Sequence, residues 1–321
     1  MESTPEHQPL KNFPISFFAI VMGLSGFAIA LSKGGEVLGL PPMVGNAILL
    51  LAFAVFAAIT LLYLMKLARY RSEVVKELHH PIKLSFFPAS SISLILFSIA
   101  TLHIDPMLSK VLWSVGTAIQ LAFTLFVMSR WIHHSGFEIQ HITPAWFIPI
   151  VGNILVPIAG VHHFSPEISW FFFSLGLLFW IVLLTIFFYR IIFHHPIAEK
   201  LVPTFFILIA PPAVGFISYV ALNNGLDNFA RVLYYVAMFF VLLLVTQFRM
   251  FTRISFFLSW WAYSFPVAAF TIASMLMFQK TGNGAFYQLS WLMLGLLTVL
   301  ITLLGSMTIN AISRKKICVE E

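Results

Sequence analysis

Ten apolar stretches, separated by short polar segments, follow one another along the whole chain. Each is close in length to the roughly 20 apolar residues that a helix needs to cross a bilayer. The first has no small-residue cleavage site and further stretches follow it, so we do not expect a cleaved signal peptide. The approximate limits of the stretches are 13–31, 43–65, 84–102, 110–131, 144–160, 170–193, 203–222, 232–248, 255–278 and 287–309. The pattern predicts an all-α integral membrane protein: a cytoplasmic tail (1–12), a transmembrane domain of ten helices (13–309) and a second tail (310–321).

Prolines divide the stretches into two kinds that alternate. A proline removes a backbone donor and bends a helix, and in lipid the freed carbonyls need partners, so bent helices belong inside the protein. We therefore predict an inner ring of five kinked odd-numbered helices and an outer ring of five even-numbered ones. The alternative is that prolines are simply common in membrane helices. The nine prolines of the odd stretches, against none in the even ones, are Pro14, Pro88, Pro144, Pro149, Pro157, Pro203, Pro211, Pro212 and Pro266.

A weak repeat supports the same division. Each odd stretch has an aromatic pair near its start, and the first two pairs are Phe17-Phe18 and Phe86-Phe87. The repeating unit would be a hairpin of one inner and one outer helix. Phenylalanine is abundant, with 35 in the chain, so some of these pairs are expected by chance.

Composition excludes several classes of protein. Hydrophobic residues make up 60% of the chain and charged residues only 9%, and the mean hydropathy is +0.95. Soluble domains carry about 25% charged residues, so a soluble, nucleic-acid-binding or disordered protein is excluded. The basic residues indicate topology instead: with the N-terminus inside, fourteen of the eighteen Lys and Arg residues fall on the cytoplasmic side. We expect a multi-pass membrane protein with both termini cytoplasmic.

Charged groups are missing from the spans themselves. All twelve Asp and Glu residues lie in loops or tails, and no Lys or Arg lies at mid-span. Proton-coupled transporters normally carry an ionisable relay inside the membrane. The chain also has no Walker loop, H-E-x-x-H or G-x-S-x-G motif, so the sequence does not favour an enzyme. A passive pore needs no charge at its middle, only a path and a gate.

Basic residues recur at the predicted cytoplasmic ends of the inner helices. The N-terminus of a helix carries partial positive charge and unpaired N–H groups, and with basic side chains it would favour anions at the inner mouth. The alternative is that the positive-inside rule alone places these residues there. The five candidates, one for each inner helix, are Lys11, Lys83, His141, Lys200 and Arg253.

Histidines invite a metal hypothesis that we do not favour. Adjacent helical residues point about 100° apart, so a pair is not a chelate by itself. The simpler interpretation is polar residues at the membrane interface, and we expect no metal site and no cofactor. The four pairs are His79-His80, His133-His134, His162-His163 and His194-His195.

The ninth stretch carries the most distinctive segment. Pro266 would bend the helix, and Phe265 shares a face with small residues near the bend. A phenyl ring projecting into a narrow bore would exclude hydrated ions and would open the path by rotating away. The alternative is an ordinary packed core phenylalanine. The other candidates on this gate helix are Trp261, Ala262 and Ala269, and the candidates for lining the pore are Gly23, Pro88, Pro149, Gly152 and Pro212.

Several strings identify a resemblance that covers essentially all ten stretches. They are Trp260-Trp261-Ala262-Tyr263-Ser264-Phe265-Pro266, Ala210-Pro211-Pro212-Ala213-Val214, Val151-Gly152-Asn153, and Phe13-Pro14-Ile15 through Gly23-Leu24-Ser25. With these strings the sequence resembles the TehA family of bacterial tellurite-resistance membrane proteins, which is related to the slow anion channels of plant guard cells.

The resemblance implies a fold and a function. It implies five helical hairpins in pseudo-fivefold arrangement around a central pore, and a homotrimer in which each subunit has its own pore. Family members conduct small anions such as chloride and nitrate, and the gating phenylalanine of the family corresponds to Phe265. Some relatives carry dicarboxylates, so the alternative is a secondary transporter that exports tellurite or C4-dicarboxylates. A membrane scaffold or sensor without transport is a third possibility.

Overall fold

The computed structural model describes residues 8–133 and 136–318, and within these residues it contains helices and no strand. Ten helical segments are long and apolar enough to cross a membrane, which confirms the predicted fold class and number of spans. The odd-numbered spans are Ile15–Leu38, Lys83–Thr101, Pro144–His163, Glu199–Asn223 and Leu258–Thr281. The even-numbered spans are the single helices α2 (Pro42–Arg69), α5 (Pro106–His133), α8 (Pro166–Phe193), α10 (Asn228–Thr246) and α13 (Gly284–Ser313). Short helices α3 (Arg71–His79), η3 (Ile139–His141) and α11 (Phe248–Thr252) lie in the connections.

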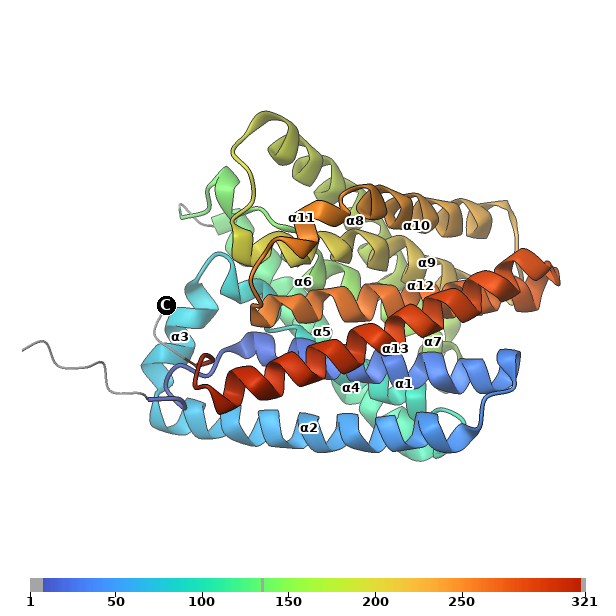
Figure 1. Ribbon diagram of the computed structural model, residues 1–321, viewed down its shortest axis with the longest axis horizontal. Helices are drawn as coiled ribbons and strands as arrows, with labels where there is room; N and C mark the ends of the chain where they lie inside the picture. Colours follow the sequence, from blue (N-terminus) through green and yellow to red (C-terminus); the bar gives the residue numbers. More distant parts are fainter. Residues whose placement is uncertain (1–7, 134–135, 319–321) are drawn as a thin grey trace, which may run out of the picture.

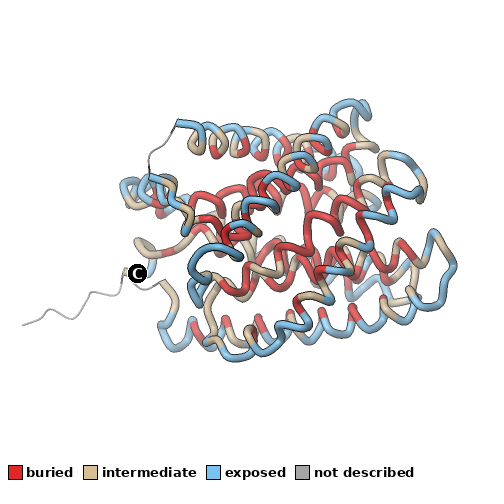
Figure 2. The backbone as a smooth tube through the Cα atoms, turned by 90° about the horizontal axis from the view of Figure 1, so that it is seen from above, coloured by how far each residue is buried: buried red, intermediate tan, exposed pale blue. Residues whose placement is uncertain are grey.

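The two kinds of span differ in burial. In the most apolar part of each odd span, 61–83% of the residues are buried, whereas the corresponding share in the even spans is 17–33%. Figure 2 shows the buried residues concentrated along the helices in the middle of the bundle and the exposed ones along its periphery. The predicted division is confirmed, and we call the odd spans inner and the even spans outer.

The inner spans form a closed ring. Each packs against the inner spans before and after it in the chain, and the last, α12 (Ser264–Thr281), packs against the first, α1 (Phe18–Leu38). Each outer helix lies against its own inner partner and against the next inner span, so α13 contacts both α12 and α1 (Figure 1). Because every outer helix returns the chain to its starting side, all five inner spans begin at the same end of the bundle.

Every inner span begins with a 3₁₀ helix and continues as an α-helix. The 3₁₀ segments are η1 (Ile15–Phe17), η2 (Lys83–Phe86), η4 (Pro144–Trp146), η6 (Glu199–Ile209) and η7 (Leu258–Tyr263), and the fifth span has another, η5 (Gly152–Leu155). The α-helical parts not yet named are α4 (Ala89–Thr101), α6 (Phe147–Val151), α7 (Val156–His163) and α9 (Ala210–Asn223). None of the outer spans contains a described 3₁₀ segment.

Prolines lie at the junctions between these helix types. Pro149, Pro157, Pro211, Pro212 and Pro266 are each the second or third residue of an α-helix. The first turn of an α-helix has no intrahelical partner for its N–H groups, so a proline there costs no hydrogen bond. The kinks that the prolines predict are therefore changes of helix type, and Pro266 opens α12 rather than interrupting it.

A buried ion pair fastens one outer helix to the inner ring. The Lys66 ammonium, in the last turn of α2, donates to the Glu77 carboxylate of α3 at 3.0 Å and to the backbone carbonyl of Phe13 at 2.7 Å. The Tyr63 hydroxyl donates to the same carboxylate oxygen at 2.8 Å. Lys66 is only 2% exposed, so the pair links α2, α3 and the start of the first inner span away from water.

Candidate functional site

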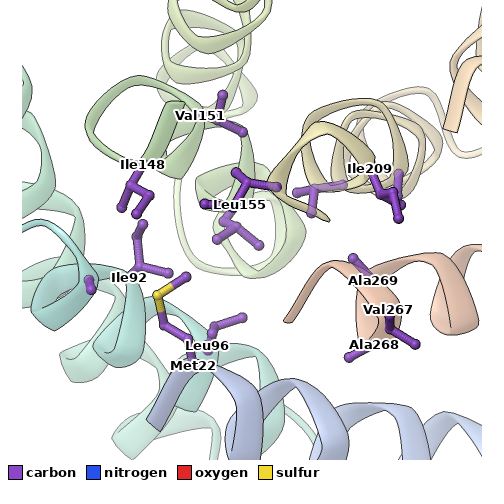
Figure 3. Close-up of a cluster of buried hydrophobic side chains, with 14 of the residues drawn as sticks. Met22, Ile92, Leu96, Ile148, Val151, Leu155, Ile209, Val267, Ala268 and Ala269 are labelled. Carbon is purple, nitrogen blue, oxygen red and sulfur yellow. The ribbon is translucent and has the colours of Figure 1, made fainter. Parts of the chain in front are cut away.

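A cavity of about 50 Å³ lies inside the inner ring. All five inner spans contribute to it, for example through Met22, Ile92, Val151, Val214 and Phe265, and no described residue of an outer span does. Figure 3 shows Met22, Ile92, Ile148 and Leu155 gathered between the first, third and fifth spans. The space is large enough for only a few water molecules. It lies where the alternation of prolines predicts a central path.

The lining of the cavity is apolar. It consists of aliphatic and aromatic side chains together with Gly152 and Pro266. The one lining side chain that bears a hydrogen-bonding group, Trp261, donates its indole N–H outward to the Thr308 hydroxyl of α13, at 2.9 Å. The wall therefore offers an ion or a water molecule no side-chain hydrogen bond.

Buried polar side chains of the third, fourth and fifth spans bond to one another and to the Pro149 carbonyl. Gln120 of α5 is fully buried; its amide oxygen accepts from Ser91 at 2.7 Å, and its amide nitrogen donates to the Pro149 carbonyl at 3.0 Å. Thr124 donates to the same carbonyl at 2.8 Å, and the Asn153 amide donates to the Thr124 hydroxyl at 2.9 Å. This network supports the fifth span where it changes from α6 to η5, next to the lining residues Val151 and Gly152.

Phe265 lies against a part of the first span that has no side chain. A Cβ atom on Gly26 would lie 3.3 Å from Cδ2 of Phe265 and 3.1 Å from the Cβ of Ala268. One turn earlier, a Cβ on Gly23 would lie 2.2 Å from the Ser264 hydroxyl. The two glycines thus let α1 and α12 approach closely, and the ring of Phe265 remains half-buried at the cavity.

The structure brings some of the predicted site residues together and separates others. Phe265, Trp261, Ala262 and Pro266 all line the cavity, and so does Gly152. The other predicted residues are not among the described lining residues: Ala269 of the gate helix, and Gly23, Pro88, Pro149 and Pro212 of the predicted pore lining. Gly23 faces Ser264 and Trp261, and the Pro149 carbonyl faces α5.

Sequence reasoning missed most of the aliphatic wall. Met22, Ile92, Leu155, Ile207 and Val214 line the cavity. Their residue types are equally suited to lipid, to a packed core and to a bore, so no local signal distinguishes them. Their position on proline-bearing spans was the only available indication.

The five predicted mouth residues all lie where the inner spans begin. Lys83 and Lys200 are the first and second residues of their spans, and Lys11, His141 and Arg253 lie a few residues before theirs. None of them lines the cavity. The N-cap side chains of η1, η4, η6 and η7 accept no hydrogen bond from these helices, whereas the Lys83 N–H at the start of η2 donates to Nδ1 of His80 at 3.3 Å.

The outer helices contrast with this arrangement. Asp105, Ser165, Asp227 and Asn283 accept hydrogen bonds from backbone N–H groups at the starts of α5, α8, α10 and α13. These residue types are the preferred N-caps. At the opposite end of the bundle, four of the five outer helices therefore begin with a side chain that accepts from one or two of their first N–H groups.

Members of three of the histidine pairs make hydrogen bonds within their own helix or to a neighbouring helix. His79 and His133 bond the carbonyls of Val75 and Ser129 in their own helices, and His163 bonds the hydroxyl of Ser109 at 2.8 Å. In the described ranges, no group of three His, Cys, Asp or Glu residues is placed to hold a metal ion. His134 lies outside the described residues.

Comparisons with known proteins point to one family. The sequence model of the family described as "Voltage-dependent anion channel" matches residues 12–309. The chain is similar to an uncharacterized transporter of Methanocaldococcus jannaschii, with 24% identity over 297 residues that cover 85% of this chain and 87% of the relative. It is also similar to the tellurite resistance protein TehA homolog of Haemophilus influenzae, with 26% identity over 271 residues, or 81% of this chain and 80% of the relative.

A plant relative extends well beyond the matched region. The S-type anion channel SLAH2 of Arabidopsis thaliana is 26% identical over 310 residues, which cover 94% of this chain but 60% of the plant protein. The chain thus spans less than two thirds of that channel.

Proposed function

The chain belongs to the voltage-dependent anion channel family, and from this premise we propose that it conducts small inorganic anions, of the chloride and nitrate class, through a pore inside the inner ring. Phe265 is the gate of this pore. The observation that carries the proposal is the cavity to which all five inner spans contribute and which Phe265 lines. Neither the family nor the site favours an enzyme, because the relatives carry the names of channels and transporters and the wall of the cavity is apolar.

Selectivity for anions follows from the ends of the inner spans. The first turns of η6 and η7, which have no side-chain cap, direct N–H groups and partial positive charge toward one end of the bundle. Lys11, Lys83, His141, Lys200 and Arg253 lie at the same end and add to the attraction for anions. We assign this end to the cytoplasm of a bacterial cell, on the inner membrane, because it carries most of the Lys and Arg residues.

The assembly that we propose is a homotrimer with one pore in each subunit. Within a subunit, five hairpins would repeat around the bore with pseudo-fivefold symmetry. The closed ring of contacts among the inner spans and the regular placement of each outer helix between two inner spans support this symmetry. Residues 1–12 and 310–321 would be cytoplasmic tails on either side of the channel domain, 13–309.

Substitution of Phe265 tests the gate. We expect Phe265→Ala to raise anion current in planar bilayers by at least about tenfold, because removal of the ring widens the path at the cavity that it lines. The matched control is Phe171→Ala, which removes a phenylalanine that is 55% exposed on the outer helix α8 and should leave the current unchanged. The reversal potential in asymmetric salt gives the charge of the permeant ion. Equal currents in the parent and Phe265→Ala would reject the gate, and a cation-selective reversal potential would reject the anion pathway.

A second candidate is a secondary transporter that exports tellurite or dicarboxylates. The similarity to a protein named as a transporter, over 85% of this chain, favours it, as does the tellurite resistance name of another relative. The two candidates differ in rate, because carriers saturate and turn over far more slowly than pores conduct. Unitary current steps would favour the channel, and proton flux of fixed stoichiometry with the substrate would favour the transporter.

A further inference from the structure

We propose that the cavity excludes water, forms a hydrophobic barrier in series with Phe265, and binds small apolar molecules. This inference rests on the proposed function, since it adds a second barrier to the same path. The chemical class of the ligand follows from the wall: monatomic gases and small hydrocarbons, which need contact surface and no hydrogen bonds.

The side chains of the wall offer water no strong hydrogen bond. A buried water molecule normally makes about three hydrogen bonds to polar groups, whereas cavities lined by Leu, Ile and Phe stay dry and accept benzene or xenon. Here Ile92, Ile148, Val151, Leu155 and Val214 surround a space of about 50 Å³. That volume is sufficient for a few water molecules, so it is the chemistry of the wall and not its size that keeps them out.

Three polar side chains that lie next in sequence to lining residues donate hydrogen bonds elsewhere. Ser91 donates to the Pro88 carbonyl and to Gln120, and Ser264 donates to the Trp261 carbonyl at 2.6 Å. The Asn153 amide nitrogen bonds toward α5 and to the Ile150 carbonyl. All three residues are completely buried. The Asn153 amide oxygen is buried without a partner among the described residues, but the donors of all three side chains are occupied, so a water molecule would have to compete with these bonds for a donor.

An apolar cavity without water opposes the passage of ions by a different mechanism from the Phe265 ring, which blocks the path sterically. An anion that enters it must leave its hydration shell without gaining a hydrogen bond, and burying an uncompensated charge is very costly. Rotation or removal of the Phe265 ring widens the path but leaves the aliphatic wall in place. The remaining barrier therefore depends on the polarity of the wall more than on its width.

Substitutions that separate polarity from width test the inference. Both substitutions are made in the Phe265→Ala background. Val151→Thr keeps the shape of the side chain and adds a hydroxyl group, whereas Val151→Ala enlarges the cavity and adds no polar group. We expect Val151→Thr to raise anion flux at least about threefold over Phe265→Ala alone, and Val151→Ala to raise it less. Leu155→Asn, a second replacement of similar shape, should act in the same direction. Thermal stability and elution as a single species establish that each variant is folded.

The outcomes separate the two proposals. If Phe265→Ala conducts and Val151→Ala exceeds Val151→Thr, the path is limited by width and the hydrophobic barrier is rejected. If Phe265→Ala itself does not conduct, the proposed gate fails, and the dry cavity is then decided by ligand binding alone.

Xenon provides that binding measurement. Crystals of the otherwise unmodified protein held under xenon pressure should show a xenon atom in contact with Val151 and Leu155, and Val151→Thr should reduce its occupancy at least about twofold. Absence of xenon from this cavity in the unmodified protein, with xenon bound elsewhere in the same crystal as a positive control, would overturn the inference.

Discussion

The ninth and tenth spans are consecutive in the chain and both apolar, yet they have opposite surroundings. In the most apolar part of the ninth span, 72% of the residues are buried, whereas the corresponding share in the tenth span is 33%. The ninth begins as a 3₁₀ helix and packs its Ser264 against Gly23, whereas the tenth is one α-helix of 30 residues, and a Cβ atom added to its Gly295 would meet no atom of another helix within 4 Å. Both spans are apolar enough to cross a membrane, so apolarity does not distinguish an inner span from an outer one. The inner span differs by its change of helix type and by its close backbone contact with a neighbouring span.

The first prediction concerns a buried cation on an outer helix. The outer helix α2 has the lowest buried share of all ten spans, but it holds the buried cation Lys66. Lys66→Met leaves the Glu77 carboxylate buried without its partner, so we expect a loss of about 3–5 kcal/mol in the free energy of unfolding. Unfolding in detergent micelles, followed by tryptophan fluorescence, measures the loss.

The double variant Lys66→Met/Glu77→Gln is the control for this pair. It removes both charges and should recover part of the loss, because no buried charge is then left unpaired. A loss below about 1 kcal/mol in the single variant would mean that the pair is solvated and that α2 is an ordinary outer helix.

The second prediction compares two glycines, one in each kind of span. Gly23→Ala places a Cβ 2.2 Å from the Ser264 hydroxyl, so we expect a destabilisation of about 1–3 kcal/mol as α1 and α12 move apart. Gly295→Ala meets open space on α13 and should be neutral or stabilising by up to about 1 kcal/mol through helix propensity. The melting temperature should fall in Gly23→Ala and stay unchanged or rise in Gly295→Ala, and an equal fall in both would contradict the division.

The third prediction concerns polar groups within the spans. Gln120→Leu removes the amide that joins Ser91 to the Pro149 carbonyl and should cost about 1 kcal/mol, the usual range for interhelical hydrogen bonds in membranes. Its control is Thr302→Val on α13, where the hydroxyl bonds only the Thr298 carbonyl of its own helix. Equal stability of both variants and the parent would show that the network contributes nothing to the inner ring.

The fourth and smallest effect concerns the capped end of an outer helix. The Ala230 backbone N–H and, to a lesser degree, the Tyr219 hydroxyl lower the pKa of Asp227. A carboxylate whose pKa is lowered by folding stabilises the protein above its ordinary pKa, and this contribution is lost as the pH falls through the lowered value. Asp227→Asn keeps a capping side chain but does not titrate. The stability difference between parent and variant should therefore be present at neutral pH and narrow in acid, and a constant difference would contradict it.

Much of the architecture is predictable because its signals are periodic or compositional. Span number follows from the length of the apolar stretches, and the inner position of the odd spans follows from their prolines. Phe265, Trp261, Ala262 and Pro266 meet at the cavity because they share one short segment of a proline-bearing span. In each case the property that matters is local in the sequence.

Other features escaped prediction for physical reasons. The 3₁₀ segments depend on packing within the ring, and an aliphatic residue such as Ile207 gives no sign of whether it will face lipid or the cavity. Gly23 was predicted to line the path because it is small, but its missing side chain makes room for Ser264 instead. In the sequence, Lys66 is only one of the basic residues that indicate the cytoplasmic side. Nothing local indicates that Glu77 will be buried beside it.

Ring closure has a consequence for biosynthesis. Gly23 and Ser264 belong to the earliest and latest parts of the chain to be translated, and the first inner helix is complete only when α12 and α13 arrive beside it. Before α12 is inserted, we therefore expect the ring of inner spans to be open, with the Gly23 face of α1 in contact with lipid or the insertion machinery. Until the last hairpin has been inserted, we expect the ring of inner spans to stay open and to enclose no cavity.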